Sequence, residues 1–228
     1  MVMNMNLDFI LVIIILFIPL IANIKVKSSY SWFSKEKNSL NMKGKDVARK
    51  ILDSNGLYYV DIIPRRGELT DHYNPVTKKI TLSESSYNSK SVAAAAIAAH
   101  EVGHAIQDKE CYSFLRFRNK MVPFVNYTSN AASILIILSF VLNIVNMLDA
   151  GIILLLVGLL FQLITLPVEF DASRRAEKQL KSCGLLSNID IYGTKKVLSA
   201  AAFTYVASFF AMALQILRLI LLRNNNRN

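Results

Sequence analysis

The chain reads SVAAAAIAAHEVGH from Ser91 to His104, and this stretch organises the rest of the protein. Alanine is the strongest helix former, so the run predicts a helix that continues into the residues at its end. Positions four apart on a helix share a face, which points the imidazoles of His100 and His104 in one direction. Glu101 completes the H-E-x-x-H spacing, in which two histidines bind zinc and the glutamate reaches the water on the metal. The stretch therefore predicts one zinc ion per chain, held on a helix over residues 91–109.

A helix with two core histidines bonded to backbone carbonyls is the simpler alternative. Under this alternative, it is a coincidence that two of the chain's three histidines stand at ligand spacing with a glutamate after the first. We therefore favour the metal site.

The apolar residues of the chain are gathered in long blocks. The sequence is 53% hydrophobic and its mean hydropathy is +0.36, which is high for a soluble domain. Blocks of this length predict membrane-spanning helices. The first block lacks a preceding base and a clear cleavage site, which favours an uncleaved anchor over a signal peptide. We predict four spans, near residues 7–24, 124–147, 150–167 and 199–222.

The basic residues predict the orientation of these spans. Residues 25–120 hold 17 of the 26 Lys and Arg, and residues 168–198 hold six more, whereas the turn expected at 147–149 has none. The positive-inside rule then places both basic segments in the cytoplasm and both termini outside, although Arg223 and Arg227 near the C-terminus speak weakly against this. Anionic lipid accounts for the net charge of +10. The bases are scattered and accompany no binding motif, so no nucleic-acid partner is expected.

The polar segments predict a small α+β domain. A helix is expected over 46–54, a strand over 57–63 that ends at Pro64, a loop over 67–75 and a second strand over 79–83. Residues 80–83 are expected to form a sheet edge beside the zinc helix, to which an extended peptide can add. The fold class is therefore mainly α and membrane-integral, with a short sheet. The expected divisions are an anchor (1–24), a cytoplasmic catalytic segment (25–120), a membrane hairpin (121–167), a second cytoplasmic segment (168–198) and a last span with its tail (199–228).

A catalytic zinc site usually has three protein ligands and one open position. Glu169 is the favoured third ligand, because it follows Pro167 at the predicted end of a span on the same side of the membrane as His100 and His104. Asp171 and the remaining histidine, His72, are the alternatives.

Four separated blocks of sequence together resemble one family. They are HEVGHAIQ at 100–107, LPVEFDAS at 166–173, DHYNP at 71–75 and ITLS at 80–83. In these blocks the chain is similar, over nearly its whole length, to the YugP-type membrane zinc metallopeptidases of bacteria, which share a plan with HtpX-type and CAAX prenyl peptidases. The resemblance implies a zincin-like domain. The HtpX-type and CAAX prenyl peptidases carry an E-x-x-x-D motif, in which the glutamate binds zinc and the aspartate supports a ligand histidine. The glutamate falls on Glu169, while Ser173 stands at the aspartate position and is expected to bond a ligand histidine.

The expected activity is zinc-dependent hydrolysis of peptide bonds at the cytoplasmic face of the cell membrane. Glu101 is the expected general base for the zinc-activated water, and His72, Tyr73 and Arg174 are candidate donors to the oxyanion. The substrate is expected to be a peptide or a membrane protein, and the oligomeric state stays open. The alternatives are an intramembrane site-2-type protease, a non-catalytic zinc-stabilised membrane scaffold and, most weakly, a metal transporter.

Overall fold

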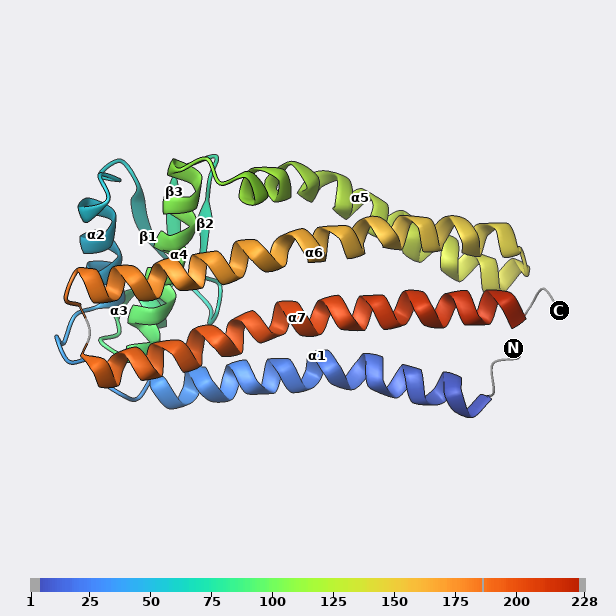
Figure 1. Ribbon diagram of the computed structural model, residues 1–228, viewed down its shortest axis with the longest axis horizontal. Helices are drawn as coiled ribbons and strands as arrows, with labels where there is room; N and C mark the ends of the chain where they lie inside the picture. The colour runs from blue at the N-terminus through green and yellow to red at the C-terminus, as the bar shows by residue number, and fades with distance from the viewer. Residues whose placement is uncertain (1–4, 186, 226–228) are drawn as a thin grey trace. The chain divides into compact units, whose positions relative to one another are not determined.

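The computed structural model describes residues 5–185 and 187–225, which form a mainly helical chain with one small sheet (Figure 1). In chain order the elements are α1 (Met5–Phe33), α2 (Gly44–Ser54), β1 (Asp61–Arg65), β2 (His72–Asn74), β3 (Lys79–Ser83), α3 (Glu84–Asn88), α4 (Val92–Lys109), α5 (Ser113–Leu142), α6 (Val145–Ser182) and α7 (Asn188–Asn225).

The four predicted spans correspond to four long helices. Among the described residues, the helical segments that are long and apolar enough to cross a membrane are Asn6–Phe33, Ser113–Leu142, Val145–Ser182 and Asp190–Asn225. Each is longer than the apolar run that predicted it. The helices therefore continue past the apolar sequence into polar sequence.

The chain divides into two compact units. The first comprises Met1–Asn23, Arg116–Leu166 and Thr204–Asn228, and the second comprises Ile24–Leu115 and Pro167–Phe203. The apolar runs lie mainly in the first unit, while the sheet and the H-E-x-x-H helix lie in the second.

Two ion pairs join helices within the first unit. The guanidinium of Arg218 on α7 donates to both carboxylate oxygens of Asp8 on α1, at 2.6 and 3.2 Å. Arg223, nearer the end of α7, donates in the same two-pronged way to Asp149 on α6. These charges lie in or beside apolar helices, where an unpaired charge would be costly. The pairs therefore fix how α7 aligns with its two neighbours in this unit.

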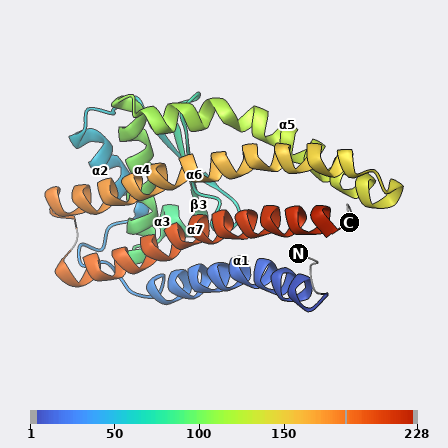
Figure 2. The ribbon, with the colours of Figure 1, turned by 45° about the vertical axis from the view of Figure 1, so that its right-hand side comes forward.

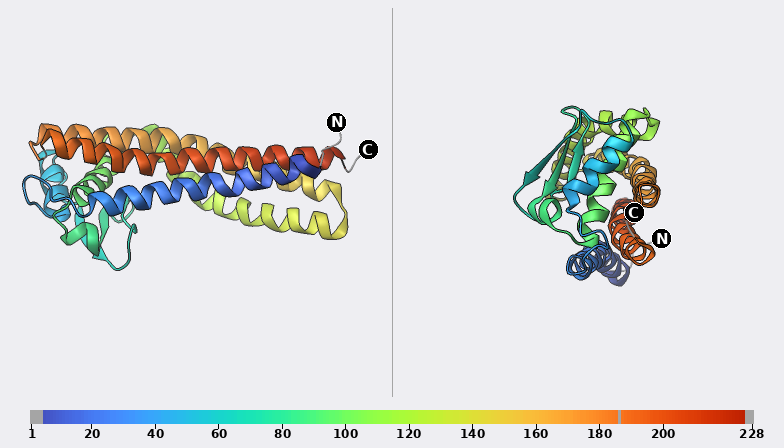
Figure 3. Two further views of the ribbon diagram at one scale, coloured as in Figure 1. Left: turned by 90° about the horizontal axis from the view of Figure 1, so that it is seen from below. Right: turned by 90° about the vertical axis from the view of Figure 1, so that its left-hand side faces the viewer.

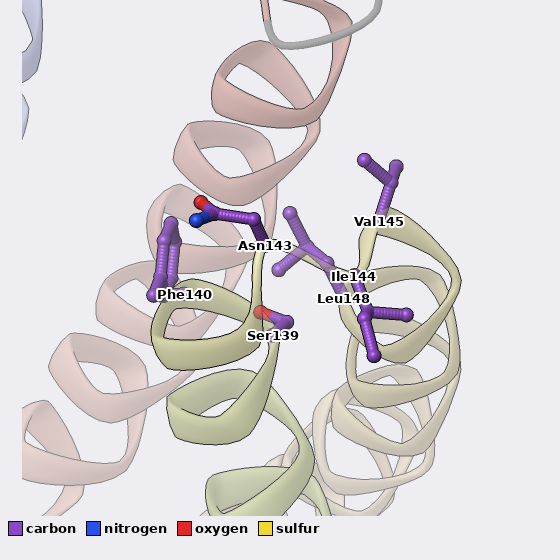
Figure 4. Close-up of a pocket in the computed structure, with 6 residues that line it drawn as sticks. All are labelled: Ser139, Phe140, Asn143, Ile144, Val145 and Leu148. Atoms are coloured by element: carbon purple, nitrogen blue, oxygen red, sulfur yellow. The ribbon is translucent and has the colours of Figure 1, made fainter.

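The turn between the second and third spans differs from the prediction. It was expected at 147–149, but α5 ends at Leu142 and α6 begins at Val145, so that Asp149 is helical. Asn143 adopts a left-handed φ of 55°, which asparagine tolerates better than most residues. Figure 4 shows this turn, with Ser139, Asn143 and Leu148 around a shallow hollow at the end of the hairpin. Hydropathy did not predict the break at Asn143, because the residues on both sides of it are apolar.

The second unit contains a three-stranded sheet in the order β1-β3-β2. β1 runs parallel to β3, with Ile62 opposite Ile80, and β2 runs antiparallel to β3, with Tyr73 opposite Ile80. The helices α2 and α4 lie on one face of the sheet, as Figure 2 and the end-on view of Figure 3 show. Their fully buried residues, including Ile51 and Leu52, join Ile80 and Leu82 in the core.

Four details of the predicted sheet were wrong. The first strand begins at Asp61 and not at residue 57, because residues 57–60 form a turn. Pro64 lies inside β1 and does not end it; β1 is an edge strand, where a missing N–H is tolerated. β2 forms within the segment expected to be a loop. β3 is the central strand, so the edge available beside α4 belongs to β2.

Candidate metal centre

The helix α4 carries the predicted zinc ligands. Its N-cap is Ser91, whose hydroxyl accepts a hydrogen bond from the N–H of Ala94 at 3.1 Å. All of its alanines are buried, so the helix lies deep in the second unit with its backbone close to its neighbours. This burial holds the motif at the end of the helix in a fixed position.

The structure brings His100 and His104 together with Glu169 on α6. One carboxylate oxygen of Glu169 lies 3.3 Å from Nε2 of His100 and 3.6 Å from Nε2 of His104. Ligand atoms about 2.0–2.2 Å from a tetrahedral zinc ion lie roughly 3.3–3.6 Å from one another. Both distances to Glu169 fit a zinc ion, and the three ligand atoms all lie within 4.8 Å of one another. Glu169 itself is buried, with 2% of its surface exposed.

Hydrogen bonds at the far nitrogens orient both imidazoles. The Ser173 hydroxyl lies 3.2 Å from Nδ1 of His100, and the amide oxygen of Gln107 lies 3.0 Å from Nδ1 of His104. With these nitrogens protonated, each Nε2 presents a lone pair toward the carboxylate of Glu169. Converging lone pairs and a carboxylate form a donor set that a cation stabilises, and such hydrogen bonds to ligand histidines are usual in zinc sites.

Gln107 belongs to the site, although the sequence did not single it out. Its side chain is fully buried, and its amide nitrogen donates to the carbonyl of Val168 at 2.8 Å and to Asp171 at 2.9 Å. Asp171 also accepts a hydrogen bond from Arg175 at 2.5 Å. Asp171 is therefore linked to His104 through Gln107 and lies outside the three converging ligands. The sequence could have indicated this contact, because Gln107 stands three residues after His104 and so shares its helix face.

Gly103 lets α4 and α6 approach closely. A Cβ atom at this position would lie 2.5 Å from the carbonyl oxygen of Ala172. Ala172 lies between Glu169 and Ser173 on α6, so the close approach occurs beside both of the α6 residues that face the histidines. The second variable position of the motif thus determines the helix spacing.

Glu101 is buried beside the three ligands. Burial raises the pKa of its carboxyl group to about 7, and the neighbouring carboxylates of Glu169 and Asp71 act in the same direction. His100 and a hydrogen bond from the backbone N–H of Tyr73 act in the opposite direction. A carboxyl group with a pKa near neutrality is suited to take up and release a proton.

The three remaining candidates occupy different surroundings. The Tyr73 hydroxyl donates to Asp108 at 2.7 Å, and burial beside that carboxylate raises the pKa of Tyr73 well above its ordinary value. His72 is half-buried, and its Nδ1 lies 2.9 Å from the carbonyl oxygen of Thr70. Arg174 is exposed. Of these residues, Tyr73 touches Glu101, and it does so through its main chain and not its hydroxyl.

Comparison with known proteins agrees with this class of site. A membrane protein with a His-His-Glu site on two helices has the features of a zinc peptidase. Residues 8–224 match the family model described as "Putative neutral zinc metallopeptidase", and the chain belongs to this family. It is 44% identical, over 91% of its length and 92% of the relative's, to the "Putative membrane protease YugP" of Bacillus subtilis (strain 168). No solved structure matches the chain.

Proposed function

We propose that the protein is a membrane-anchored zinc endopeptidase whose site faces the cytoplasm. The observation that carries the proposal is the convergence of His100, His104 and Glu169 at zinc-ligand spacing, with Glu101 beside them. Family membership and the relative's name support a protease role.

Each side chain of the site has a different role in the proposed hydrolysis. When bound, zinc would supply a Lewis acid that polarises the peptide carbonyl and makes water more acidic. Glu101 takes a proton from the attacking water while the water oxygen bonds to the carbonyl carbon. Glu101 then delivers that proton to the leaving amine as the C–N bond breaks. Gln107 and Ser173 keep the two imidazoles in the required tautomer and orientation.

The edge strand β2 is the proposed binding place for the substrate. It has one partner strand, β3, and its Tyr73 N–H reaches Glu101. An extended peptide that pairs with this edge passes beside the general base and is held mainly by main-chain bonds. Extended segments of membrane proteins or unfolded proteins are therefore the proposed substrates, with little dependence on their sequence.

The position of α4 favours this proposal over intramembrane cleavage. Within residues 5–185 and 187–225, four helical segments qualify as spans, and α4 is not one of them. It packs against α2 and the sheet instead. A site-2-type protease would carry its H-E-x-x-H motif within a span.

The activity is tested with Glu101→Gln. The purified variant should keep its zinc and its fold and lose about 10²–10⁴-fold in turnover of an unfolded protein substrate. Glu68→Gln, the same change at an exposed loop residue, serves as the matched control and should hydrolyse like wild type. Normal turnover by Glu101→Gln would reject the mechanism, and zinc-loaded wild type without activity would favour a scaffold.

The orientation is tested by labelling single cysteines in intact cells after Cys111 and Cys183 are replaced by serine. Val76, which is 87% exposed between β2 and β3, reports on the catalytic unit, and Ile144 reports on the α5–α6 turn. An impermeant reagent should label Ile144→Cys and should reach Val76→Cys only after lysis. The opposite pattern would place the site outside the cell.

A further inference from the structure

A groove lies between the end of α1 and the start of α7, within the second unit. Its volume is about 510 Å³, and its lining includes Lys25, Ser29 and Trp32 from α1 and Tyr192 and Lys196 from α7. None of these residues belongs to the candidate metal centre. We call this feature the α1–α7 groove.

Two lysines give the α1–α7 groove a positive charge. The ammonium of Lys25 lies 4.7 Å from the ring centre of Phe203, and that of Lys196 lies 5.3 Å from the ring centre of Tyr192. Neither ammonium forms an ion pair with a carboxylate anywhere in residues 5–185 and 187–225. Two cations without acidic partners on facing helices favour an anionic ligand.

A hydroxyl group lining the groove also needs a partner. The side-chain oxygen of Ser29 is buried, and it has no hydrogen-bond partner among the described residues. A buried hydroxyl is costly unless it is hydrogen-bonded. A phosphate oxygen bound in the groove would accept a hydrogen bond from this hydroxyl and remove the cost.

The residues around the groove are typical of a membrane–water interface. Trp32 and Tyr192 are 67% and 61% exposed, and the Trp32 indole N–H donates to Glu36. Trp and Tyr are enriched at the level of lipid headgroups. Lys25 follows the apolar run of α1 directly, and the last residue of that run, Ile24, is 58% exposed. A lipid whose headgroup occupies the groove can therefore lay an acyl chain along α1.

We propose that the α1–α7 groove binds the headgroup of an anionic phospholipid. Lys25 and Lys196 attract the anionic headgroup and Ser29 donates to its phosphate, while Trp32 and Tyr192 border the headgroup on the side away from Ile24. The site holds one lipid, and it is separate from the peptidase proposal because it shares no residue with the metal centre.

Trp32 provides the measurement, since it is the single tryptophan of the chain. The full-length protein is placed in phosphatidylcholine nanodiscs, and the fraction of phosphatidylglycerol is raised stepwise from zero. The Trp32 emission should change and saturate with the anionic lipid. Lys25→Gln/Lys196→Gln should weaken the apparent affinity roughly 30-fold, at about five-fold for each lysine.

The matched control is Lys27→Gln/Lys178→Gln, which removes the same charge from two exposed lysines outside the groove. It should bind like wild type, and Lys25→Arg/Lys196→Arg, which retains both charges, should also bind. Equal weakening in both glutamine variants would show general surface attraction and overturn the site. The site would also be overturned if added phosphatidylcholine changed the Trp32 emission as much as phosphatidylglycerol does. Saturation of the emission change by inorganic phosphate would assign the groove to a soluble anion. Circular dichroism of each variant confirms that it is folded.

Discussion

Replacement of Gly103 by alanine tests whether the close approach of α4 and α6 builds the metal centre. The new Cβ would lie 2.5 Å from the Ala172 carbonyl oxygen and 3.2 Å from the Cα and carbonyl carbon of that residue. Ordinary C···O contacts begin at about 3.3 Å, so the helices must separate by roughly 0.8 Å. Zinc–ligand distances tolerate about 0.2 Å. The displacement therefore exceeds the tolerance of the site about four-fold.

The expected result is a large loss of zinc affinity with a small loss of stability. Overpacking costs about 1–3 kcal/mol, and the better helix propensity of alanine returns about 1 kcal/mol. Ligands displaced in this way are expected to bind zinc roughly 10–100-fold more weakly, the loss typical when groups that orient metal ligands are disturbed. Zinc affinity is measured by titration with a competing chelator, and stability is measured by thermal unfolding.

Gly158→Ala is the matched control, because it makes the same change in a helix where the new Cβ meets the flexible end of Met212 at 3.2 Å. This variant should bind zinc like wild type. The reasoning fails if Gly103→Ala binds zinc with wild-type affinity, since the two helices would then not need their close approach.

Four further single changes test other contacts. Glu169→Ala is expected to remove most of the zinc, measured per mole of purified protein, and Ser173→Ala should lower it less; full zinc in the Glu169 variant would exclude this residue as a ligand. Gln107→Leu should weaken zinc binding about 10–100-fold in a chelator titration, because one ligand imidazole loses the group that orients it; unchanged binding would make Gln107 a packing residue only. Arg218→Leu leaves Asp8 without its partner and should lower stability by about 1–3 kcal/mol, as thermal unfolding in detergent would show, whereas the double change with Asp8→Leu should recover much of the loss.

Local patterns predicted the elements of the site better than its contacts. The spacing of His100 and His104 depends on the geometry of a single helix, so the sequence alone could predict their common direction. The link from Gln107 to Val168 depends on where α6 crosses α4, and no spacing within either helix encodes that crossing. The close approach at Gly103 was missed for the same reason.

The sheet shows the same limit. β3 was predicted over its observed residues because alternating apolar and β-branched residues mark it. β2 has three residues, in a stretch rich in turn formers, and it becomes a strand by pairing with β3. Pro64 suggested the end of a strand. It lies on an edge strand, however, where its missing N–H need not leave a hydrogen bond of the sheet unmade. The extent of β1 and the presence of β2 therefore depend on the strand order of the sheet, which the local composition does not encode.

The two helices of the metal centre also set an order of events during synthesis. His100 and Glu169 lie 69 positions apart, and the chain between them forms α5 and most of α6. A growing chain that has presented its first two ligands still lacks the third until this whole hairpin has been made and folded back. The ligand set of a newly made copy is therefore incomplete while the hairpin is being inserted. All three ligands can hold a zinc ion only after this stretch of the chain has been made.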